Sequence, residues 1–305
     1  MLSSHRLLEG RRIGLSDPIL QRRLLFTAMT AVAFATACTQ EQDAPPAAMA
    51  EDASIAASRA SALEAGAAAG QGDFQSVLDR VHERTRNADS RDGILAEERL
   101  YSNFNEELII RDFFQDRREG FYLDVGCAGP IKGSNTYYLE KHLGWTGIGV
   151  DALDGYAAAW KEMRPKSRFL RHLVSNRSDE SQTFFKSWGL GLSSTNREWA
   201  TGKAFGENFP TEEIETTTIT LNDLLEREGV TKIDLMSMDI EGHESRALAG
   251  FDIERFQPEL VVIEGQIAKP KIQAIASYFE WHGYARIEKY RAFDIVNEYY
   301  QRVER

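Results

Sequence analysis

Phe121-Tyr-Leu-Asp-Val-Gly126 is a mostly apolar run with an acid, Asp124, two residues before a glycine, and the fold can be predicted outward from it. The glycine begins a turn, and Tyr137 to Leu143 then has the pattern of a short helix that stops at Gly144. A second apolar run, Thr146 to Val150, ends at Asp151. Strand, glycine turn, helix, strand and acid follow one another in the order of a nucleotide-binding βαβ unit. These residues therefore predict an α/β fold with a parallel sheet.

Further apolar runs extend this sheet toward the C-terminus. Strands are predicted at 169–174, 214–221, 233–238 and 260–263, and short helices at 222–227 and 245–248. Ligands of an open parallel sheet bind outside the carboxyl ends of its strands. We therefore expect the acids at four of these strand ends to converge on one crevice, namely Asp124, Asp151, Asp239 and Glu264.

The first turn indicates which nucleotide would bind. It offers Gly126 and Gly129 but no third glycine at the dinucleotide spacing, which disfavours a NAD-dependent oxidoreductase. Asp124 can instead face an ammonium group, and Asp151 can accept hydrogen bonds from ribose hydroxyls. S-adenosylmethionine carries both groups and no phosphate. Taken singly, Asp124 could also be an acid that caps a loop, and Asp151 a turn residue.

The segment from Ser102 to Arg302 resembles the FkbM family of S-adenosylmethionine-dependent methyltransferases. The resemblance rests on Tyr122-Leu-Asp-Val-Gly-Cys127, on Ser134 to Asp151, and on Ile233-Asp-Leu-Met-Ser-Met-Asp-Ile-Glu-Gly-His-Glu244. It implies a Rossmann-like, doubly wound, mostly parallel seven-stranded sheet, and O-methylation of a hydroxyl on a sugar, a similar polyol or another natural product. It also assigns site residues. Asp124, Gly126, Cys127, Asp151 and Ser175 are candidates for cofactor binding, and Asp239 and Glu241 belong to a D-x-E-G motif.

Methyl transfer from a sulfonium is an in-line displacement, so the protein must align the reactants and remove a proton from the acceptor. Asp239 is the first candidate for organising that site. His243 could act as general base, or could be a solvent-facing residue in the first turn of a helix. Glu241 or Glu264 could join Asp239 around Mg²⁺, since hard cations prefer carboxylate oxygens.

The stretch 184–211 interrupts the alternation of strands and helices. Its aromatic, glycine and serine residues suit recognition of a carbohydrate or other small-molecule acceptor, and equally a hydrophobic lid.

Composition excludes other classes of function. The 305 residues include 36 basic and 47 acidic side chains, a formal net charge of −11, which argues against nucleic acid as a partner. The two cysteines, Cys38 and Cys127, are too far apart in sequence for a local zinc-ligand pattern or a disulfide framework.

The N-terminal segment is predicted to be separate from the fold. Residues 1–37 hold Arg22-Arg23, an uncharged run and small residues before Cys38, and they resemble a lipoprotein signal peptide that would lead to lipidation of Cys38. A buried N-terminal helix, or a start of translation at Met49, would also fit. Residues 38–72 are alanine-rich and predict a disordered, flexible tether.

The remaining chain divides into a helical segment, 73–118, and a methyltransferase domain, 119–305. The helical segment has amphipathic patterns at Phe74 to Val81 and Glu106 to Asp116, with Gly120 as the expected stop of the second.

The predicted export signal conflicts with the predicted cofactor, because S-adenosylmethionine is made and held in the cytoplasm. Either the chain is a membrane-anchored lipoprotein, in which case it could be a non-catalytic binding protein on a methyltransferase scaffold, or translation starts downstream and the protein is cytoplasmic.

Overall fold

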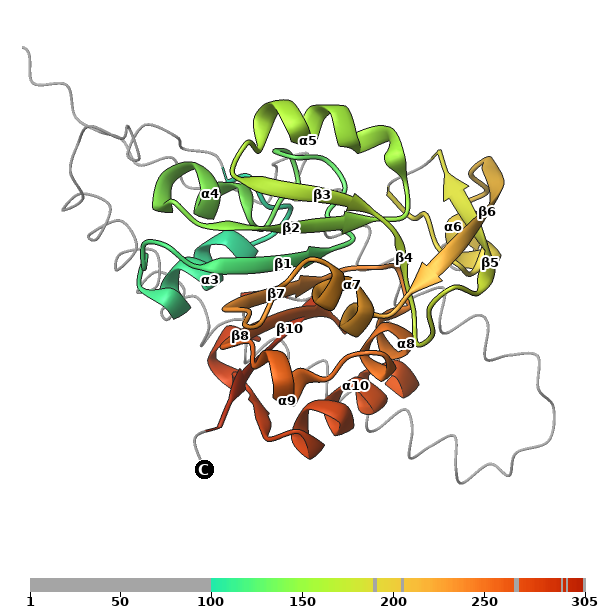
Figure 1. Ribbon diagram of the computed structural model, residues 1–305. Coiled ribbons are helices and arrows are strands. Elements are labelled where there is room, and N and C mark those ends of the chain that lie inside the picture. Colours follow the sequence, from blue (N-terminus) through green and yellow to red (C-terminus); the bar gives the residue numbers. More distant parts are fainter. Residues whose placement is uncertain are drawn as a thin grey trace, which may run out of the picture.

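The computed structural model describes residues 100–188, 191–203, 206–265, 269–291, 293–294 and 296–303 (Figure 1). The predicted signal peptide with Cys38, the tether over 38–72 and the helix from Phe74 to Val81 lie outside these residues. Among the helices of the described part, none combines the length and the apolar character needed to cross a membrane.

A seven-stranded sheet forms the centre of the fold, in the order β3-β2-β1-β7-β8-β10-β9. Its strands are β1 (Phe121–Val125), β2 (Thr146–Asp151), β3 (Ser167–Arg171), β7 (Leu235–Met238), β8 (Leu260–Glu264), β9 (Tyr284–Arg286) and β10 (Asn297–Arg302). Neighbouring strands are parallel except at β10, which is antiparallel to both β8 and β9. This confirms the predicted mostly parallel, Rossmann-like sheet.

Helices cover both faces of the sheet (Figure 1), as a doubly wound fold requires. They are α3 (Glu106–Phe114), α4 (Tyr137–Leu143), α5 (Ala157–Met163), α7 (Leu221–Arg227), α8 (Glu244–Ala249), α9 (Ile253–Phe256) and α10 (Lys269–Trp281). Alternate residues of β1 supply the two cores: Leu123 packs with residues of α7 to α10, and Tyr122 packs with residues of α3 and α4. The alternation follows from the period of two in a strand.

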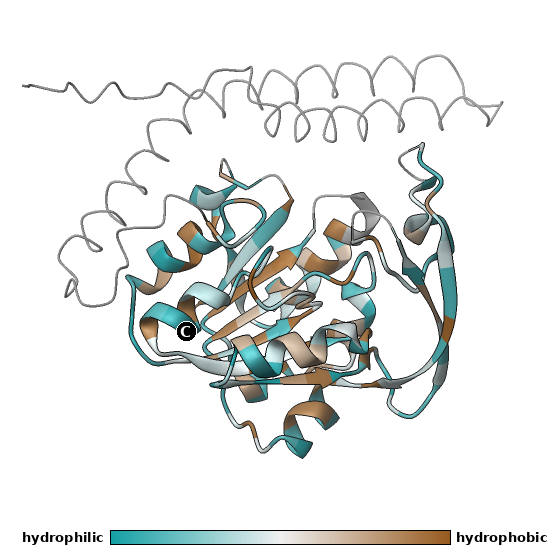
Figure 2. Cartoon of the chain, turned by 90° about the horizontal axis from the view of Figure 1, so that it is seen from above, coloured by the Kyte–Doolittle hydropathy of each residue, from teal (hydrophilic) through white to brown (hydrophobic). Residues whose placement is uncertain are grey.

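A second, three-stranded sheet lies to one side, in the order β4-β6-β5. Its strands are β4 (Leu173–Val174), β5 (Ser181–Ser187) and β6 (Thr211–Ile219). In Figure 2 the β5–β6 ribbon is mostly teal, that is hydrophilic, whereas the central strands carry much of the hydrophobic colour. The short helix α6 (Arg197–Ala200) lies between β5 and β6 in the sequence.

Two strand predictions are corrected by this second sheet. The strand predicted at 169–174 is two strands, because β3 ends at Arg171 and β4 pairs with β6 instead of the central sheet. The strand predicted at 214–221 also leaves the central sheet, since β6 forms a seven-residue antiparallel ladder with β5. Its many threonines and glutamates suit a half-exposed ribbon, not the interior of a parallel sheet.

The ends of two helices test the predicted stops. α4 ends at Gly144, which has the left-handed φ of 76° that was expected of a C-terminal glycine. α3 ends earlier than predicted, because Gln115 adopts a left-handed φ of 53° directly after Phe114. Gly120 is needed for a different reason: a Cβ there would lie 2.8 Å from the ring of Trp145.

Candidate functional site

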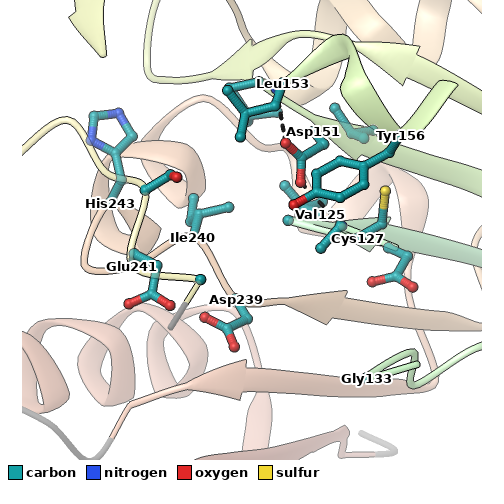
Figure 3. Close-up of a pocket in the computed structure, with 18 of the residues that line it drawn as sticks. Val125, Cys127, Gly133, Asp151, Leu153, Tyr156, Asp239, Ile240, Glu241 and His243 are labelled. Atoms are coloured by element: carbon teal, nitrogen blue, oxygen red, sulfur yellow. Dashed lines mark hydrogen bonds between the residues drawn. The ribbon is translucent and has the colours of Figure 1, made fainter. Parts of the chain in front are cut away.

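A pocket of about 530 Å³ lies at the carboxyl ends of β1, β2 and β7. The strand order reverses between β1 and β7, and such a switch point is where open α/β sheets bind ligands. Figure 3 shows Asp151 and Tyr156 on one side of this pocket and Asp239 and Glu241 on the other. Residues of β5 and of the segment 187–195 also line it.

Gly126 forms the turn after β1 and allows a close approach between two strand ends. Its φ is +82°, and a Cβ at this position would lie 1.8 Å from the carbonyl oxygen of Asp239. Its backbone N–H donates to the carbonyl of Val150 over 2.8 Å. No other residue type satisfies both the left-handed conformation and the contact.

Asp151, at the end of β2, holds this turn from the other side. One carboxylate oxygen accepts from the N–H of Ala128 (3.0 Å), and the other accepts from the N–H of Leu153 (2.8 Å), the bond drawn in Figure 3. Burial raises the pKa of Asp151 and these two bonds lower it. Each carboxylate oxygen has a further lone pair, so Asp151 can still accept from a ligand.

Asp124 is buried in β1 and lines the same pocket. Its Oδ2 accepts a hydrogen bond from the hydroxyl of Thr136 over 2.7 Å. Burial raises the pKa of Asp124 to about 6, while the Thr136 bond and the charge of Arg164 lower it. The structure thus makes Asp124 both an anchor of the following loop and a pocket residue.

The other two cofactor candidates differ in position. Cys127 lines the pocket as a buried free thiol, whose pKa is raised chiefly by burial. Ser175 is not among the residues that line the pocket; its hydroxyl lies 3.2 Å from Nε2 of His243. The structure therefore brings Asp124, Gly126, Cys127 and Asp151 together in the pocket. Ser175 lies outside it and contacts His243.

The turn after β7 carries the D-x-E-G residues. Asp239 faces the pocket, and Glu241 follows with a left-handed φ of 55°. The Glu241 carboxylate accepts from the indole N–H of Trp199 (2.5 Å), and its carbonyl accepts from the hydroxyl of Ser194 (2.8 Å). Residues of the 184–211 stretch thereby fix both the side chain and the backbone of Glu241.

Asp239, Glu241 and Glu264 form a cluster in which one oxygen of each carboxylate lies within 4.8 Å of the others. Glu264 is buried and does not line the pocket, and it shares a hydrogen bond with Asp239. Burial raises the pKa of all three acids, and the charge of Asp239 raises those of Glu241 and Glu264 further. Asp239 remains open to water inside the pocket, although protein atoms crowd it elsewhere.

His243 is buried, so the alternative of a solvent-facing residue is wrong. Its Nδ1 lies 2.9 Å from the hydroxyl of Thr195, and its Nε2 lies 3.2 Å from that of Ser175. In Figure 3 the ring turns away from Asp239. A role as general base would require His243 to exchange one of these bonds for the acceptor.

Several pocket residues were not predicted from the sequence. Asn135 lines the pocket and donates to the hydroxyl of Ser237 over 3.0 Å. Glu106 reaches the pocket from α3, and burial raises its pKa to about 8. Tyr156 stands five residues after Asp151 in the sequence and lines the same pocket. Its closeness to a predicted pocket acid is the signal that could have identified it.

Residues 124–286 match the family model described as the methyltransferase FkbM domain, which is just over half of the chain. The chain belongs to the FkbM methyltransferase family. The matched range runs from Asp124 to the end of β9 and so includes Asp151, Asp239 and Glu241 of the pocket. The helix α3, with Glu106, precedes the matched FkbM range.

Among solved structures, this FkbM methyltransferase is similar to a TehB-like SAM-dependent methyltransferase from Corynebacterium glutamicum. The two share 14% sequence identity at a TM-score of 0.38, with 72% of this chain and 98% of the other covered. Among curated proteins, no match to the chain is found.

Proposed function

We propose that this FkbM methyltransferase uses S-adenosylmethionine to methylate a hydroxyl of a sugar, a similar polyol or a related natural product. One observation carries the proposal: Asp124, Asp151 and Asp239, from the ends of three adjacent strands, all line one pocket. An ammonium, a ribose and a reacting centre are the parts of this cofactor that such acids can serve.

The cofactor is proposed to bind over the ends of β1 and β2. Asp124 would face the ammonium group, and Asp151 would accept from the ribose hydroxyls. Leu153 and Tyr156 lie beside Asp151 in the pocket and offer apolar and aromatic surface for the adenine. Gly126 keeps this region free of side-chain atoms, since its own Cβ would already collide with Asp239.

The acceptor is proposed to bind between the D-x-E-G turn and the second sheet. Ser187, Trp188, Ser193 and Thr195 line this half of the pocket. Hydroxyl and aromatic side chains together suit a polyol, which has both hydroxyls and apolar C–H faces. Asp239 lines the pocket directly after β7, the strand next to β1, and is the proposed residue for holding the acceptor hydroxyl and receiving its proton.

The raised pKa values support this role. A carboxylate that titrates close to the working pH is a better proton acceptor than an ordinary aspartate. Burial raises the pKa of Asp239 in this direction, and Glu264 can share the proton through its hydrogen bond with Asp239. His243 stays a second candidate for the base, at the edge of the same pocket.

The charge of the three-acid cluster can be balanced in two ways. The acids can share protons, or they can bind Mg²⁺, for which an all-oxygen donor set is suitable. A bound Mg²⁺ would lower the pKa of the acceptor hydroxyl. Assays with added Mg²⁺ and with EDTA separate the two: sensitivity to EDTA that Mg²⁺ reverses supports the metal, and full activity in EDTA supports shared protons.

The decisive experiment is transfer of a labelled methyl group from S-adenosylmethionine to cell-envelope glycan extracts and small polyols, together with titration by S-adenosylhomocysteine. Incorporation that depends on Asp239 supports the proposal. If the labelled methyl group on a small polyol survives the treatment that hydrolyses methyl esters, the product is an ether. Absence of S-adenosylhomocysteine binding at millimolar concentration contradicts the proposal.

A second candidate function is that of an anchored, non-catalytic binding protein on the same scaffold. The sequence before Cys38 favours it, since lipidation there would hold the domain outside the cytoplasm. Mass spectrometry of the native N-terminus tests this directly. A lipidated Cys38, together with no binding of S-adenosylhomocysteine, would support the anchored protein, whereas a chain that starts further downstream would place the enzyme with its cofactor.

A further inference from the structure

Arg164 follows α5 and is completely buried, although it does not line the pocket. Its guanidinium carbon lies 4.4 Å from the ring centre of Trp160 and 5.5 Å from those of Tyr122 and Tyr137. Burying a guanidinium is costly unless its charge and all of its donors find partners. Its partners therefore indicate what it is there to hold.

All three nitrogens of the Arg164 guanidinium donate hydrogen bonds within 3.2 Å. The acceptors are Glu140 Oε2 (2.8 Å), the carbonyl of Pro130 (2.9 Å), Ser134 Oγ (3.2 Å), the hydroxyl of Tyr122 (2.6 Å) and Thr136 Oγ1 (3.0 Å). Three of them belong to the loop 130–136, between the first turn and α4.

The bond to Thr136 continues to the pocket. A guanidinium only donates, so the Thr136 oxygen must accept from Arg164. The single hydroxyl proton of Thr136 is then left to donate to Oδ2 of Asp124, 2.7 Å away. Arg164, Thr136 and Asp124 thus form a hydrogen-bond chain with one direction, and each bond polarises the next.

The same arginine fixes the loop itself. The Ser134 hydroxyl oxygen, which accepts from Arg164, also accepts from the backbone N–H groups of Thr136 (3.3 Å) and Tyr137 (3.1 Å). Between Pro130 and Thr136, the loop presents three residues to the pocket, Lys132, Gly133 and Asn135. A single buried side chain therefore holds both ends of a pocket loop.

We propose that Arg164 is a positioning residue for the cofactor, which holds Asp124 through Thr136 in the orientation and the ionised state that an ammonium group requires. This inference rests on the proposed function, because it assigns the ammonium of S-adenosylmethionine to Asp124. It extends that function to a residue that touches neither the pocket nor the ligand.

Charges around Asp124 show why it needs such support. Burial raises its pKa most, and the charges of Asp239 and Asp151 raise it further, whereas the Thr136 hydrogen bond and the charge of Arg164 lower it. The Cys127 thiol and the Tyr122 hydroxyl, which also face Asp124, have raised pKa values of their own and stay neutral. The pKa of Asp124 is about 6 with these partners in place, and losing the Thr136 bond or the Arg164 charge would raise it further.

The test measures binding of S-adenosylhomocysteine by calorimetry between about pH 5 and about pH 8, for the wild type and four variants. Thr136→Val removes the hydroxyl at nearly constant shape, and Thr136→Ser retains it. Arg164→Lys keeps the charge but not the fork of donors. Arg168→Gln is the control, since Arg168 lies four residues on, is half-exposed and pairs with Glu228 at the surface.

We expect Thr136→Val and Arg164→Lys to move the pH midpoint of binding up by about one unit, which weakens binding about fivefold near pH 6 and about tenfold near pH 5, since one pKa unit corresponds to a tenfold change. Binding by Thr136→Ser and Arg168→Gln should stay within about twofold of the wild type. Circular dichroism and Tm are recorded for each variant, and if Arg164→Lys does not fold, Thr136→Val decides.

Two failures can be told apart. If the wild type does not bind S-adenosylhomocysteine, the proposed function is wrong and this inference falls with it. If the wild type binds, but a folded Thr136→Val binds equally well with the same pH profile, the proposed function stands and the positioning role of Arg164 is overturned. A lower Tm with an unchanged pH profile would likewise show a structural role only.

Discussion

Trp199 donates its indole N–H to the carboxylate of Glu241, 2.5 Å away, and so connects α6 to the turn after β7. Asn196 caps α6 by accepting from the N–H groups of Glu198 and Trp199, which fixes the start of this short helix. Ser194 donates to the carbonyl of Glu241 in addition. The segment between β5 and β6 is therefore fastened to an acid of the pocket.

Trp199→Phe should weaken use of the acceptor without weakening cofactor binding. The variant keeps an aromatic ring but leaves the Glu241 carboxyl group without its indole partner, and leaving a buried polar group without its partner costs about 1–3 kcal/mol. We expect kcat/KM for the acceptor to fall at least about tenfold, with unchanged affinity for S-adenosylhomocysteine. Trp281→Phe is the matched control, because Trp281 is exposed on α10. Equal loss of cofactor affinity in Trp199→Phe would contradict the assignment.

Gly126→Ala should destabilise the fold and abolish cofactor binding. The added Cβ would lie 1.8 Å from the carbonyl oxygen of Asp239 at a φ of +82°, so β1 and β7 would have to separate. Overpacking of this kind costs about 1–3 kcal/mol. Gly129→Ala is the control from the same loop, since the nearest atom to its Cβ, the carbonyl oxygen of Lys132, is 3.7 Å away. Thermal unfolding and calorimetry with S-adenosylhomocysteine measure both effects, and equal behaviour of the two variants would refute the argument.

Asp239→Asn should abolish methyl transfer while the fold survives. The amide can still contact the acceptor but cannot take its proton, and a positioned base contributes about 10²–10⁴-fold to a rate. The Tm should not fall, because the variant removes one of three crowded acids. Initial rates and thermal unfolding measure the two parts of the prediction. Full turnover by the variant would remove Asp239 from the mechanism.

The stability of the protein without ligand should fall as the pH rises from about 5 to about 8 and should level off above that. Burial raises the folded-state pKa of Glu106 to about 8. Between the ordinary pKa of a glutamate and this raised value, the unfolded chain has lost the proton that the folded chain still holds, so each step up in pH favours unfolding. Above about pH 8 both states are ionised and the loss is complete.

Glu106→Gln tests this, because it removes the ionisation. Its Tm should gain on that of the wild type by about 2–4 °C for each pH unit of this range, since one unit is worth about 1.4 kcal/mol. Glu254→Gln, at an exposed position on α9, is the charge-matched control and should follow the wild type. Parallel curves for all three proteins would show that Glu106 does not titrate here.

The unit from β1 to β2 could be predicted almost residue by residue, because it is a buried apolar strand, a glycine turn and a helix that ends at Gly144. The second sheet could not be placed. β6 has the threonines and isoleucines of a strand, but its partner β5 runs into the stretch 184–211, where no period was visible. Local pattern identifies a strand and says little about which sheet it joins.

Within the site, the acids that end strands were predictable because the sheet itself brings them to one edge. Ser175 and His243 were harder, since their positions depend on hydroxyl partners distant in sequence. Arg164 was not predicted at all. In the sequence it stands between Met163 and Pro165 and has the pattern of a surface arginine, because arginine is rarely fully buried.

Glu241 adopts a left-handed backbone conformation that glycine or asparagine tolerates better than glutamate does. Replacing it by asparagine should therefore relax the backbone and at the same time remove the acid from the cluster. Directed evolution for heat resistance alone would favour such a replacement, whereas natural selection for turnover would oppose it. Under the proposed function, the conformation of this one residue would therefore set thermal stability against turnover.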